Sequence, residues 1–564
     1  MAKRIKNPPS PWDFEVRLLA WLATCVSVFS LLFYFQRGEV LLYGDAVAHL
    51  NIARRVFDSK TPGLLQLGTV WLPLPHLLMI PFLISNKMWR LGVGGSIPSM
   101  FAYVLGTVGM FRLVRGVLSR GLEPDGPARI AAWIAALVYA GNPNLIYMQA
   151  TAMGESLYLA FFVWAVAYFC ESVRGDGKAL TKCGLCLAAA CLTRYDGWFL
   201  AVAMSGIAIL LSLFVGDMSA DENRGIRLSR SAVAKFVLIA AFAPMLWLAY
   251  NGIVYRNPLE FENGPYSAKA IERRTQSPGN PGHPGSGNIL LASRYFLKSA
   301  EGNVAENELL QRGWVLLLIV ATAAGAFSYL FRKDGGPKAL GRRWSLSVVF
   351  LTLLLIPLPF YALSVAYSGV PIFVPSWWPF SHYNVRYGLQ LLPAFAAAIG
   401  IAVALVLDSN RWSRRVRFIC VLALVVFVIA SYASVWVSGP ISLREAQVNM
   451  RTRNQLEAQL AIWLQKLPSD STLLMYLGDH VGAVQRAGIP LSHVINEGNH
   501  RVWKQPVDID GLWERALADP SKYVDYVVAS EGDAVWQAIQ NKHLQTLVEI
   551  HVTGQARAVL YRAR

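Results

Sequence analysis

The stretch Tyr43-Gly44-Asp45-Ala46-Val47-Ala48-His49-Leu50-Asn51-Ile52-Ala53-Arg54-Arg55 follows the first hydrophobic segment of the chain. It places an acid, a histidine and two arginines within about three helical turns. Gly44-Asp45 is typical of a turn that leads into a helix, where a carboxylate is favoured as a cap and by the helix dipole. Asp45 and His49 are four residues apart and share one face of that helix. Asp45 as a mere helix cap is the structural alternative, but nearly everything around it is apolar, so the acid indicates chemistry or a partner.

The composition predicts a polytopic membrane protein. Of the 564 residues, 54% are hydrophobic and only 15% are charged, which is less charge than soluble domains carry. The formal net charge is +17. The basic residues fall in short loops between apolar runs, a pattern that sets membrane orientation and does not indicate nucleic-acid binding. We therefore expect a lipid bilayer as the surroundings and no nucleic-acid partner.

Apolar runs predict about eleven transmembrane helices. The first, near residues 16–35, lacks a small-residue cleavage site and is expected to be retained. Residues 71–84 are short and interrupted by prolines, so they predict a helix that lies in the membrane interface. The further spans are expected near 97–117, 129–148, 153–172, 180–197, 198–215, 232–251, 313–331, 345–365, 386–407 and 417–437.

Alternate connections between these spans are rich in arginine and lysine, which assigns them to the cytoplasm. The polar N-terminus, with Lys3, belongs to the same side. An odd number of spans then puts the C-terminus outside, together with Asp45. The expected location is a bacterial inner membrane, with the active site and the C-terminal domain extracytoplasmic. The basic connections begin at Arg112, Arg174, Arg224, Arg332 and Arg411.

Two domains are expected. Residues 1–437 form an all-α membrane domain with external loops at 37–93 and 252–312, and residues 438–564 form a small extracytoplasmic α/β domain. The α/β assignment rests on an amphipathic helix followed by runs typical of strands. The second loop contains a proline- and glycine-rich stretch at 277–287, which is expected to be flexible or ordered by a ligand. The helix spans 454–467, and the strand-like runs are 472–477, 523–529, 547–552 and 556–561.

Charged residues inside or at the ends of spans are costly, so they are candidate functional groups. Glu155 begins a span, Arg194 and Asp196 interrupt two apolar runs, and Arg386 opens a span after the aromatic stretch 377–383. Three of them have a structural alternative: Arg194 and Asp196 would form an ion pair that holds a helix end, and Arg386 would snorkel to the interface.

The external face therefore combines one acid with several arginines near the bilayer surface. Arginine binds phosphate in a bidentate manner, and a carboxylate can act as a general base towards a hydroxyl or an amine. A sugar carried on a lipid phosphate suits both groups, because phosphate is its leaving group and arginine stabilises the departing charge.

These motifs, in this order, resemble the GT-C superfamily of lipid-phosphate-sugar-dependent glycosyltransferases, which includes protein O-mannosyltransferases and the aminoarabinose transferases of lipid A. The resemblance covers about residues 15–435, and the C-terminal domain matches nothing specific. The motifs that carry it are Gly44-Asp45, Asn142-Pro143, Glu155-Ser156-Leu157-Tyr158, Leu192-Thr193-Arg194-Tyr195-Asp196-Gly197 and Asn384-x-Arg386-Tyr387 with Pro393.

The resemblance implies that Asp45 is the catalytic base of the first external loop, and that Arg194 and Arg386 correspond to arginines that bind the donor phosphate. Many relatives have two adjacent acids in that loop, whereas this chain has Asp45-Ala46. The role of the second acid is therefore absent or is supplied by another residue, with Glu39, His49 and Glu155 as the candidates.

The predicted function is an inverting transfer of a sugar from a polyprenyl-phosphate donor to an extracytoplasmic hydroxyl or amine of a protein, lipid or glycan. No cofactor is expected to be required. A divalent metal near Asp45 and His49 would need further ligands, for which only His76 and Asp58 are close in sequence. Besides Asp45, the predicted substrate-binding residues are His49, Arg55, Glu155, Arg194, Asp196, Tyr266, Lys269, His382, Asn384, Arg386 and Tyr387.

Two alternative functions share this multispan plan. A transporter or flippase would show inverted repeats and polar sites in the middle of the membrane, whereas here the charges gather at one face. A polymerase or ligase of surface polysaccharide would share the external arginines, but such enzymes often lack an acid in the first loop.

Overall fold

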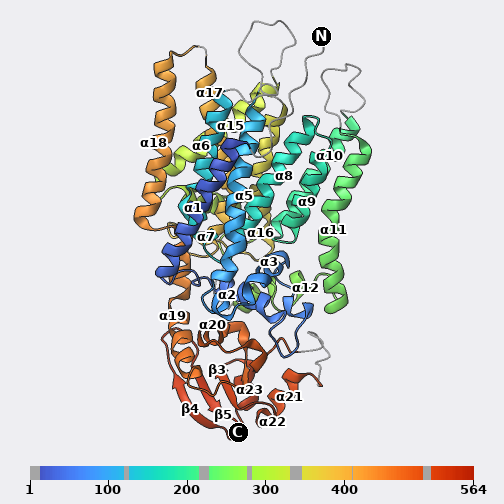
Figure 1. Cartoon of the computed structure of the whole chain (residues 1–564), viewed down its shortest axis with the longest axis vertical. Helices are drawn as coiled ribbons and strands as arrows, with labels where there is room; N and C mark the ends of the chain where they lie inside the picture. Colours follow the sequence, from blue (N-terminus) through green and yellow to red (C-terminus); the bar gives the residue numbers. More distant parts are fainter. Residues whose placement is uncertain are drawn as a thin grey trace.

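The computed structural model describes residues 13–119, 126–214, 228–275, 282–330, 346–409, 411–499 and 510–564. Long helices run roughly along one axis, and a small sheet domain lies at one end (Figure 1). The N-terminal Lys3, the basic connections around Arg224 and Arg332, and residues 277–281 of the proline- and glycine-rich stretch lie outside the described residues.

Within the described residues, eight helical segments are long and apolar enough to cross a membrane, or nine if the bent pair α6 (Gly126–Ala140) and α7 (Pro143–Gln149) counts as one. The axes of α6 and α7 meet at 61°. The eight are α1 (Phe14–Gln36), α5 (Val93–Leu118), α8 (Glu155–Val173), α10 (Asp196–Phe214), α11 (Arg230–Val254), Val349–Tyr367 with α16 (Pro357–Tyr367), Val385–Asp408 with η3 (Val385–Leu391) and α17 (Leu392–Asp408), and α18 (Arg414–Ser438) continuing into α19 (Ile441–Leu464).

Each of the eleven predicted spans coincides with a helical segment, so the difference lies in two helices. α9 (Ala179–Cys191) has 13 residues and rises only about 20 Å, less than a hydrocarbon core of about 30 Å. α15 (Glu308–Leu330) has 23 residues, but the side chains of 325–330 lie outside the described part. The predicted boundary at 197–198 is also too late, because the chain turns at 192–195.

The two predicted external loops contain short helices at the end of the bundle that faces the C-terminal domain (Figure 1). The proline-containing α3 (Leu74–Leu83) is the segment expected in the interface, and its ten residues are too few to span a bilayer. The first loop forms α2 (Gly44–Arg55), η1 (Leu64–Leu67), α3 (Leu74–Leu83) and α4 (Asn86–Arg90), and the second forms α12 (Glu260–Asn263), α13 (Ala268–Thr275) and α14 (Ile289–Val304).

The C-terminal domain contains a five-stranded mixed sheet, which confirms the predicted α/β domain. The strand order is β2-β1-β3-β5-β4. β1 pairs in parallel with β2 and β3, and β5 pairs antiparallel with β3 and β4. The two-residue β2 was not predicted. The strands are β1 (Leu473–Met475), β2 (Val494–Ile495), β3 (Tyr526–Ser530), β4 (Gln545–Ile550) and β5 (Ala558–Arg562), with helices α20 (Leu477–Ala487), α21 (Leu512–Ala518), α22 (Pro520–Tyr523) and α23 (Ala534–Ile539).

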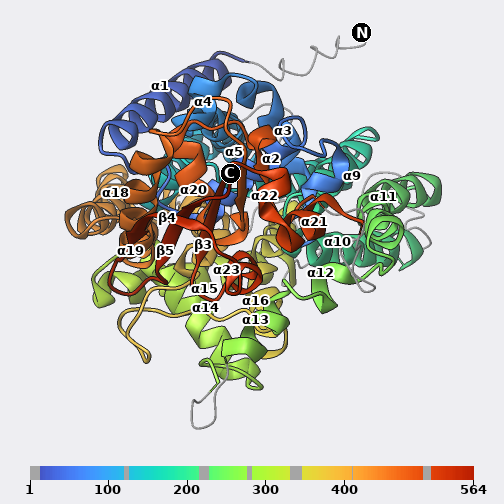
Figure 2. The same ribbon diagram turned by 90° about the horizontal axis from the view of Figure 1, so that it is seen from below.

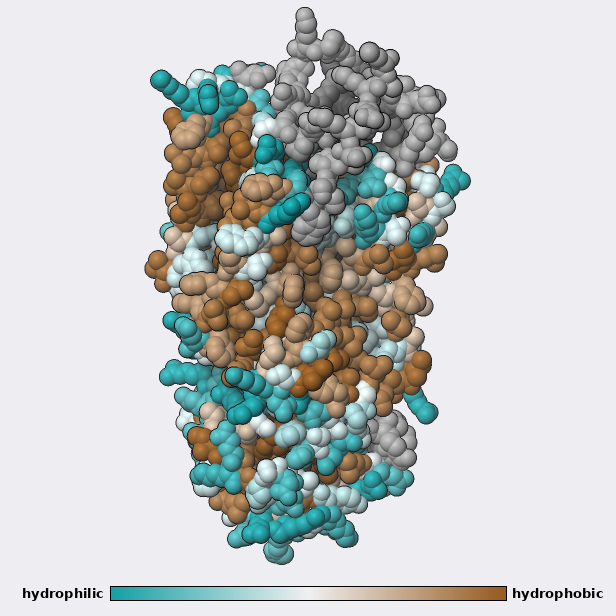
Figure 3. Space-filling model, in the orientation of Figure 1, coloured by the Kyte–Doolittle hydropathy of each residue, from teal (hydrophilic) through white to brown (hydrophobic). Residues whose placement is uncertain are grey.

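The surface matches this division. Apolar side chains form a broad band across the middle of the molecule, and polar side chains gather over the C-terminal domain (Figure 3). Seen along the long axis, that domain covers the centre of the bundle (Figure 2). The protein is thus an integral membrane protein whose loop helices lie between the bundle and the C-terminal domain.

Candidate active site

α2 presents Asp45 at its first turn. Asp45 near the helix N-terminus and Arg54 and Arg55 in the last turn both complement the helix dipole. Ala46, Leu50 and Ala53 lie on one face and are completely buried, so they hold α2 against the bundle. The Asp45 side chain remains 40% exposed. Its Oδ2 accepts a hydrogen bond from Arg386 Nη2 at 2.6 Å, so its role is more than that of a helix cap.

Arg386 is the centre of the site. Its side chain is only 8% exposed and contacts three carboxylates, which is incompatible with snorkelling to the interface. Nη2 donates to Asp45, Nε donates to Glu155 Oε1 at 3.1 Å, and Nη1 donates to Glu445 Oε1 at 2.7 Å. A buried guanidinium is stabilised by such a set of charged acceptors, since each satisfies part of its hydrogen-bonding capacity.

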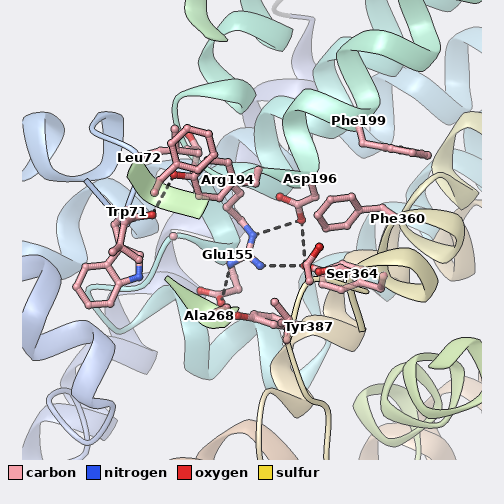
Figure 4. Close-up of a pocket in the computed structure, with 18 of the residues that line it drawn as sticks. Trp71, Leu72, Glu155, Arg194, Asp196, Phe199, Ala268, Phe360, Ser364 and Tyr387 are labelled. Carbon is pink, nitrogen blue, oxygen red and sulfur yellow. Dashed lines mark hydrogen bonds and ion pairs between the residues drawn. The ribbon is translucent and has the colours of Figure 1, made fainter. Parts of the chain in front are cut away.

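Arg194 forms the second half of the same network (Figure 4). Its Nη1 donates to Glu155 Oε1 at 3.1 Å, and its Nε donates to Asp196 Oδ2 at 3.3 Å. The Tyr361 hydroxyl accepts from Arg194 Nη2 at 2.9 Å and donates to Asp196 Oδ2 at 3.0 Å. The expected ion pair between Arg194 and Asp196 is therefore present, but it is one contact within a network in which Glu155 joins both arginines.

Aromatic rings support the two guanidinium groups. The guanidinium carbons of Arg194 and Arg386 lie 5.0 Å and 5.1 Å from the centroid of the Tyr387 ring. The guanidinium carbon of Arg386 also lies 5.0 Å from the centroid of the Tyr43 ring. These cation–π contacts hold both arginines beside one another without using their N–H groups.

The network borders a cavity of about 570 Å³, a size typical of small-ligand sites. The cavity lies where α2, α8, α16 and η3 meet the start of α10. Buried Glu155 Oε2 and Asp196 Oδ1 have no hydrogen-bond partner among the described residues. Of the twelve predicted site residues, seven line the cavity: Asp45, His49, Glu155, Arg194, Asp196, Arg386 and Tyr387. Aromatic residues complete its wall, among them Trp71, Phe199, Phe261, Phe360 and Tyr361.

His49 contacts another histidine. Its Nδ1 lies 2.8 Å from Nε2 of His76 on α3, so the pair ties α2 to α3. Burial lowers the pKa of both imidazoles. Asp58 lies elsewhere, where it pairs with Arg54 at 2.7 Å. In the described part of the chain, no group of three or more His, Cys, Asp or Glu side chains is arranged to hold a metal ion.

The other five predicted residues do not line the cavity. Burial lowers the pKa of Arg55, which is partly compensated by Glu497 of the C-terminal domain. Lys269 pairs with Glu262 at 2.7 Å. Tyr266 is 41% exposed. The remaining two are His382, whose carbonyl accepts from Asn449, and Asn384, whose side chain donates to the carbonyl of Pro371.

Sequence reasoning missed two residues of the network, Tyr361 and Glu445, and it considered His76 only as a possible metal ligand. Tyr361 lies in an apolar run, and its hydroxyl inside a predicted span was the signal that could have identified it. Glu445 lies in the predicted C-terminal domain, and its neighbours Leu443-Arg444 and Ala446 carry no motif.

The helical membrane domain, the acid-bearing helix after the first span and the small domain over the same end together form the GT-C-like fold expected from the sequence. The fold is similar to that of ArnT from Cupriavidus metallidurans bound to undecaprenyl phosphate, with a TM-score of 0.54, 15% identity and 98% of each chain covered. ArnT in the apo state matches with a TM-score of 0.51, 14% identity and the same coverage. The likeness confirms the GT-C-like fold and extends it to the C-terminal domain.

The Archaeoglobus fulgidus oligosaccharyltransferase in its apo form has a weaker likeness, with a TM-score of 0.48, 12% identity, and 92% of this chain and 70% of that chain covered. No protein-family model matches the sequence, and no curated protein is significantly similar to it.

Proposed function

We propose that this protein is a membrane glycosyltransferase that moves a sugar from a polyprenyl-phosphate donor to an extracytoplasmic hydroxyl or amine, with Asp45 as general base. The observation that carries the proposal is the position of Asp45. Of the four carboxylates in the network, it is the one with a substantially exposed side chain, 2.6 Å from Arg386 at the cavity wall. The similar fold of ArnT, crystallised with undecaprenyl phosphate, supports a lipid-phosphate donor.

In the proposed reaction, the acceptor oxygen or nitrogen attacks the anomeric carbon of the donor sugar. Asp45 takes the proton of the nucleophile as the new bond forms. The bond from the anomeric carbon to the phosphate oxygen breaks, and the electron pair leaves with the lipid phosphate. Arg386 and Arg194 stabilise the departing charge. A single direct displacement inverts the anomeric configuration of the sugar.

All three nitrogens of the Arg386 guanidinium donate to carboxylates, so an incoming phosphate competes with one of these carboxylates. Glu155 and Glu445 are 1% and 2% exposed, so a substrate cannot readily displace them. Asp45 faces the cavity. We therefore propose that the donor phosphate replaces Asp45 on Nη2, which frees the Asp45 carboxylate for the acceptor. Glu155 then supplies the fixed second acid, whereas Glu39 pairs with Arg37 at 3.0 Å and does not line the cavity.

The experiment is complementation of a strain from which the gene is deleted, with mass spectrometry of its glycans and glycolipids. The wild-type gene should restore a glycosylated product that the deletion strain lacks. Asp45→Asn keeps the shape of the side chain but removes the base, so the product should fall by about 10²–10⁴-fold. Purified Asp45→Asn protein should still bind undecaprenyl phosphate.

An active Asp45→Asn enzyme would remove Asp45 from the chemistry and leave a flippase or a polysaccharide polymerase as the alternative. A product that retains the anomeric configuration of the donor would also contradict the proposal, because retention requires a nucleophilic residue and a covalent intermediate.

A further inference from the structure

Glu445, on α19, is a buried carboxylate that contacts Arg386 but does not line the cavity. The residue is 1% exposed. Its Oε1 accepts from Arg386 Nη1 at 2.7 Å and from the backbone N–H of Asn384 at 3.0 Å, and its Oε2 accepts from the backbone N–H of Arg386 at 3.3 Å. One carboxylate therefore holds both the backbone and the guanidinium of the same arginine.

The backbone contact matters because of the local conformation. Asn384 has a φ of 54°, in the left-handed region that few residues other than glycine adopt. This residue turns the chain into η3, and the N–H groups on either side of Val385 point to Glu445. The acceptor on α19 thus stabilises the turn that brings Arg386 to the cavity.

The guanidinium plane is determined by the same carboxylate. Glu445 holds Nη1 and Glu155 holds Nε, and both acids are buried. Because the guanidinium is planar, two fixed partners determine its orientation. Nη2 is then directed towards Asp45 and the cavity, where a ligand can reach it.

The C-terminal segment also holds α2, which carries the base. The Tyr43 hydroxyl donates to the carbonyl of Ser442 at 2.7 Å, three residues before Glu445. Further along α2, Asn51 Nδ2 donates to Gln485 Oε1 of α20 at 2.8 Å. Both groups that the proposed reaction uses, Asp45 and Arg386, are therefore fixed from the same side by α19 and α20.

We propose that Glu445 is a positioning residue that orients Arg386 towards the lipid phosphate, so that the C-terminal segment forms part of the active-site support. The inference rests on the proposed function. Glu445 does not touch the substrate, since Arg386 lies between it and the cavity. Its loss should impair turnover through misplacement of Arg386, and it should not weaken anion binding, because removing a negative charge beside a guanidinium favours an anion.

The experiment compares Glu445→Gln with Glu457→Gln. Glu457 is a matched control: it lies on the same helix, is also 1% exposed, and pairs with Arg453 at 3.0 Å away from the cavity. Each variant is purified for measurement of Tm and of undecaprenyl phosphate binding. Each gene is also returned to the deletion strain, and the product is quantified by mass spectrometry.

We expect both variants to lower Tm. Glu457→Gln should restore the product in proportion to folded protein. Glu445→Gln should bind undecaprenyl phosphate at least as tightly as wild type while its product falls by up to about 10²-fold, the cost of a small misplacement of a reacting group. If Glu445→Gln does not fold, Glu445→Asp keeps the charge but shortens the reach by one methylene, and it should show the same separation of binding from turnover.

A Glu445→Gln protein that makes as much product as wild type would overturn the inference. So would a parallel loss of undecaprenyl phosphate binding and of product in both Glu445→Gln and Glu457→Gln. Failure of the proposed function gives a different result: wild-type protein that binds no undecaprenyl phosphate and restores no product refutes both proposals together.

Discussion

At the scale of single residues, the site depends on how many partners one side chain can hold. Arg386 contacts Asp45, Glu155 and Glu445 through three different nitrogens. A lysine carries the same charge on one nitrogen and cannot present a planar fork to three acceptors. The presence of arginine at this position is thus explained by geometry and not by charge alone.

Arg386→Lys should therefore lower the product of the complemented strain by about 10²-fold, the scale of removing one preorganised donor to a developing charge. The measurement is product quantification normalised to folded membrane protein. Arg312→Lys is the matched control, because Arg312 is 74% exposed and pairs only with Glu308 of its own helix in the described contacts. Near-normal turnover of Arg386→Lys would show that Arg386 has a structural role.

At the scale of elements, the position of α2 depends on its contact with α3. The His49–His76 hydrogen bond lies in a buried environment and needs at least one neutral ring to act as the acceptor. Burial lowers the pKa of His49 and lowers that of His76 well below its usual value. Both rings are therefore expected to be neutral in the folded protein near pH 7.

This pair predicts a pH dependence of stability. Below about pH 6.5 the unfolded chain binds protons on these histidines while the folded protein does not. The contribution of the pair to the free energy of unfolding should therefore be fully present above that pH and decrease as the pH falls towards the lowered pKa of the folded protein. The Tm of the purified protein should decrease between pH 7.5 and pH 5.5. In His76→Gln, one of these groups is absent and the decrease should be smaller.

His543→Gln serves as the control, because His543 lies on an exposed part of the C-terminal domain. Its Tm should follow the wild-type dependence on pH. Identical pH dependence in His76→Gln and wild type would contradict a buried neutral histidine pair.

At the scale of the whole molecule, α2, whose Asp45 and His49 line the cavity, lies at the same end as the C-terminal domain, and the start of α18 lies at the other end (Figure 1). The positive-inside rule predicts that the end rich in arginine and lysine faces the cytoplasm. We therefore propose that the cavity opens to the extracytoplasmic side, where a lipid-linked donor and an external acceptor can meet.

Single-cysteine labelling tests this orientation. Lys522→Cys in the C-terminal domain and Arg415→Cys at the start of α18 are both at exposed positions, in a chain whose native cysteines are replaced. A membrane-impermeant maleimide should label position 522 in intact spheroplasts and position 415 only after the membrane is permeabilised. The reverse pattern would place the cavity in the cytoplasm and exclude an extracytoplasmic acceptor.

The sequence by itself determined the class of the protein, the helical segments and the principal groups of the site. Hydropathy is a local property, so the apolar runs identified the helices of the bundle. The strand-like runs in the C-terminal region predicted four of the five strands. The cost of charge in a membrane identified Asp45, Glu155, Arg194 and Arg386 as candidates, since such residues persist only with partners. Apart from the local pair of Arg194 and Asp196, it could not identify those partners.

Only the tertiary structure decided which groups meet. Asp45 and Arg386 are 341 residues apart, and Glu155 and Arg386 are 231 apart, yet each pair is joined by a hydrogen bond. Glu445 enters the site because α18 continues into α19, and α19 packs beside η3. No local pattern records such contacts, because a buried charge requires only that some acceptor be near, and packing alone determines which part of the chain supplies it.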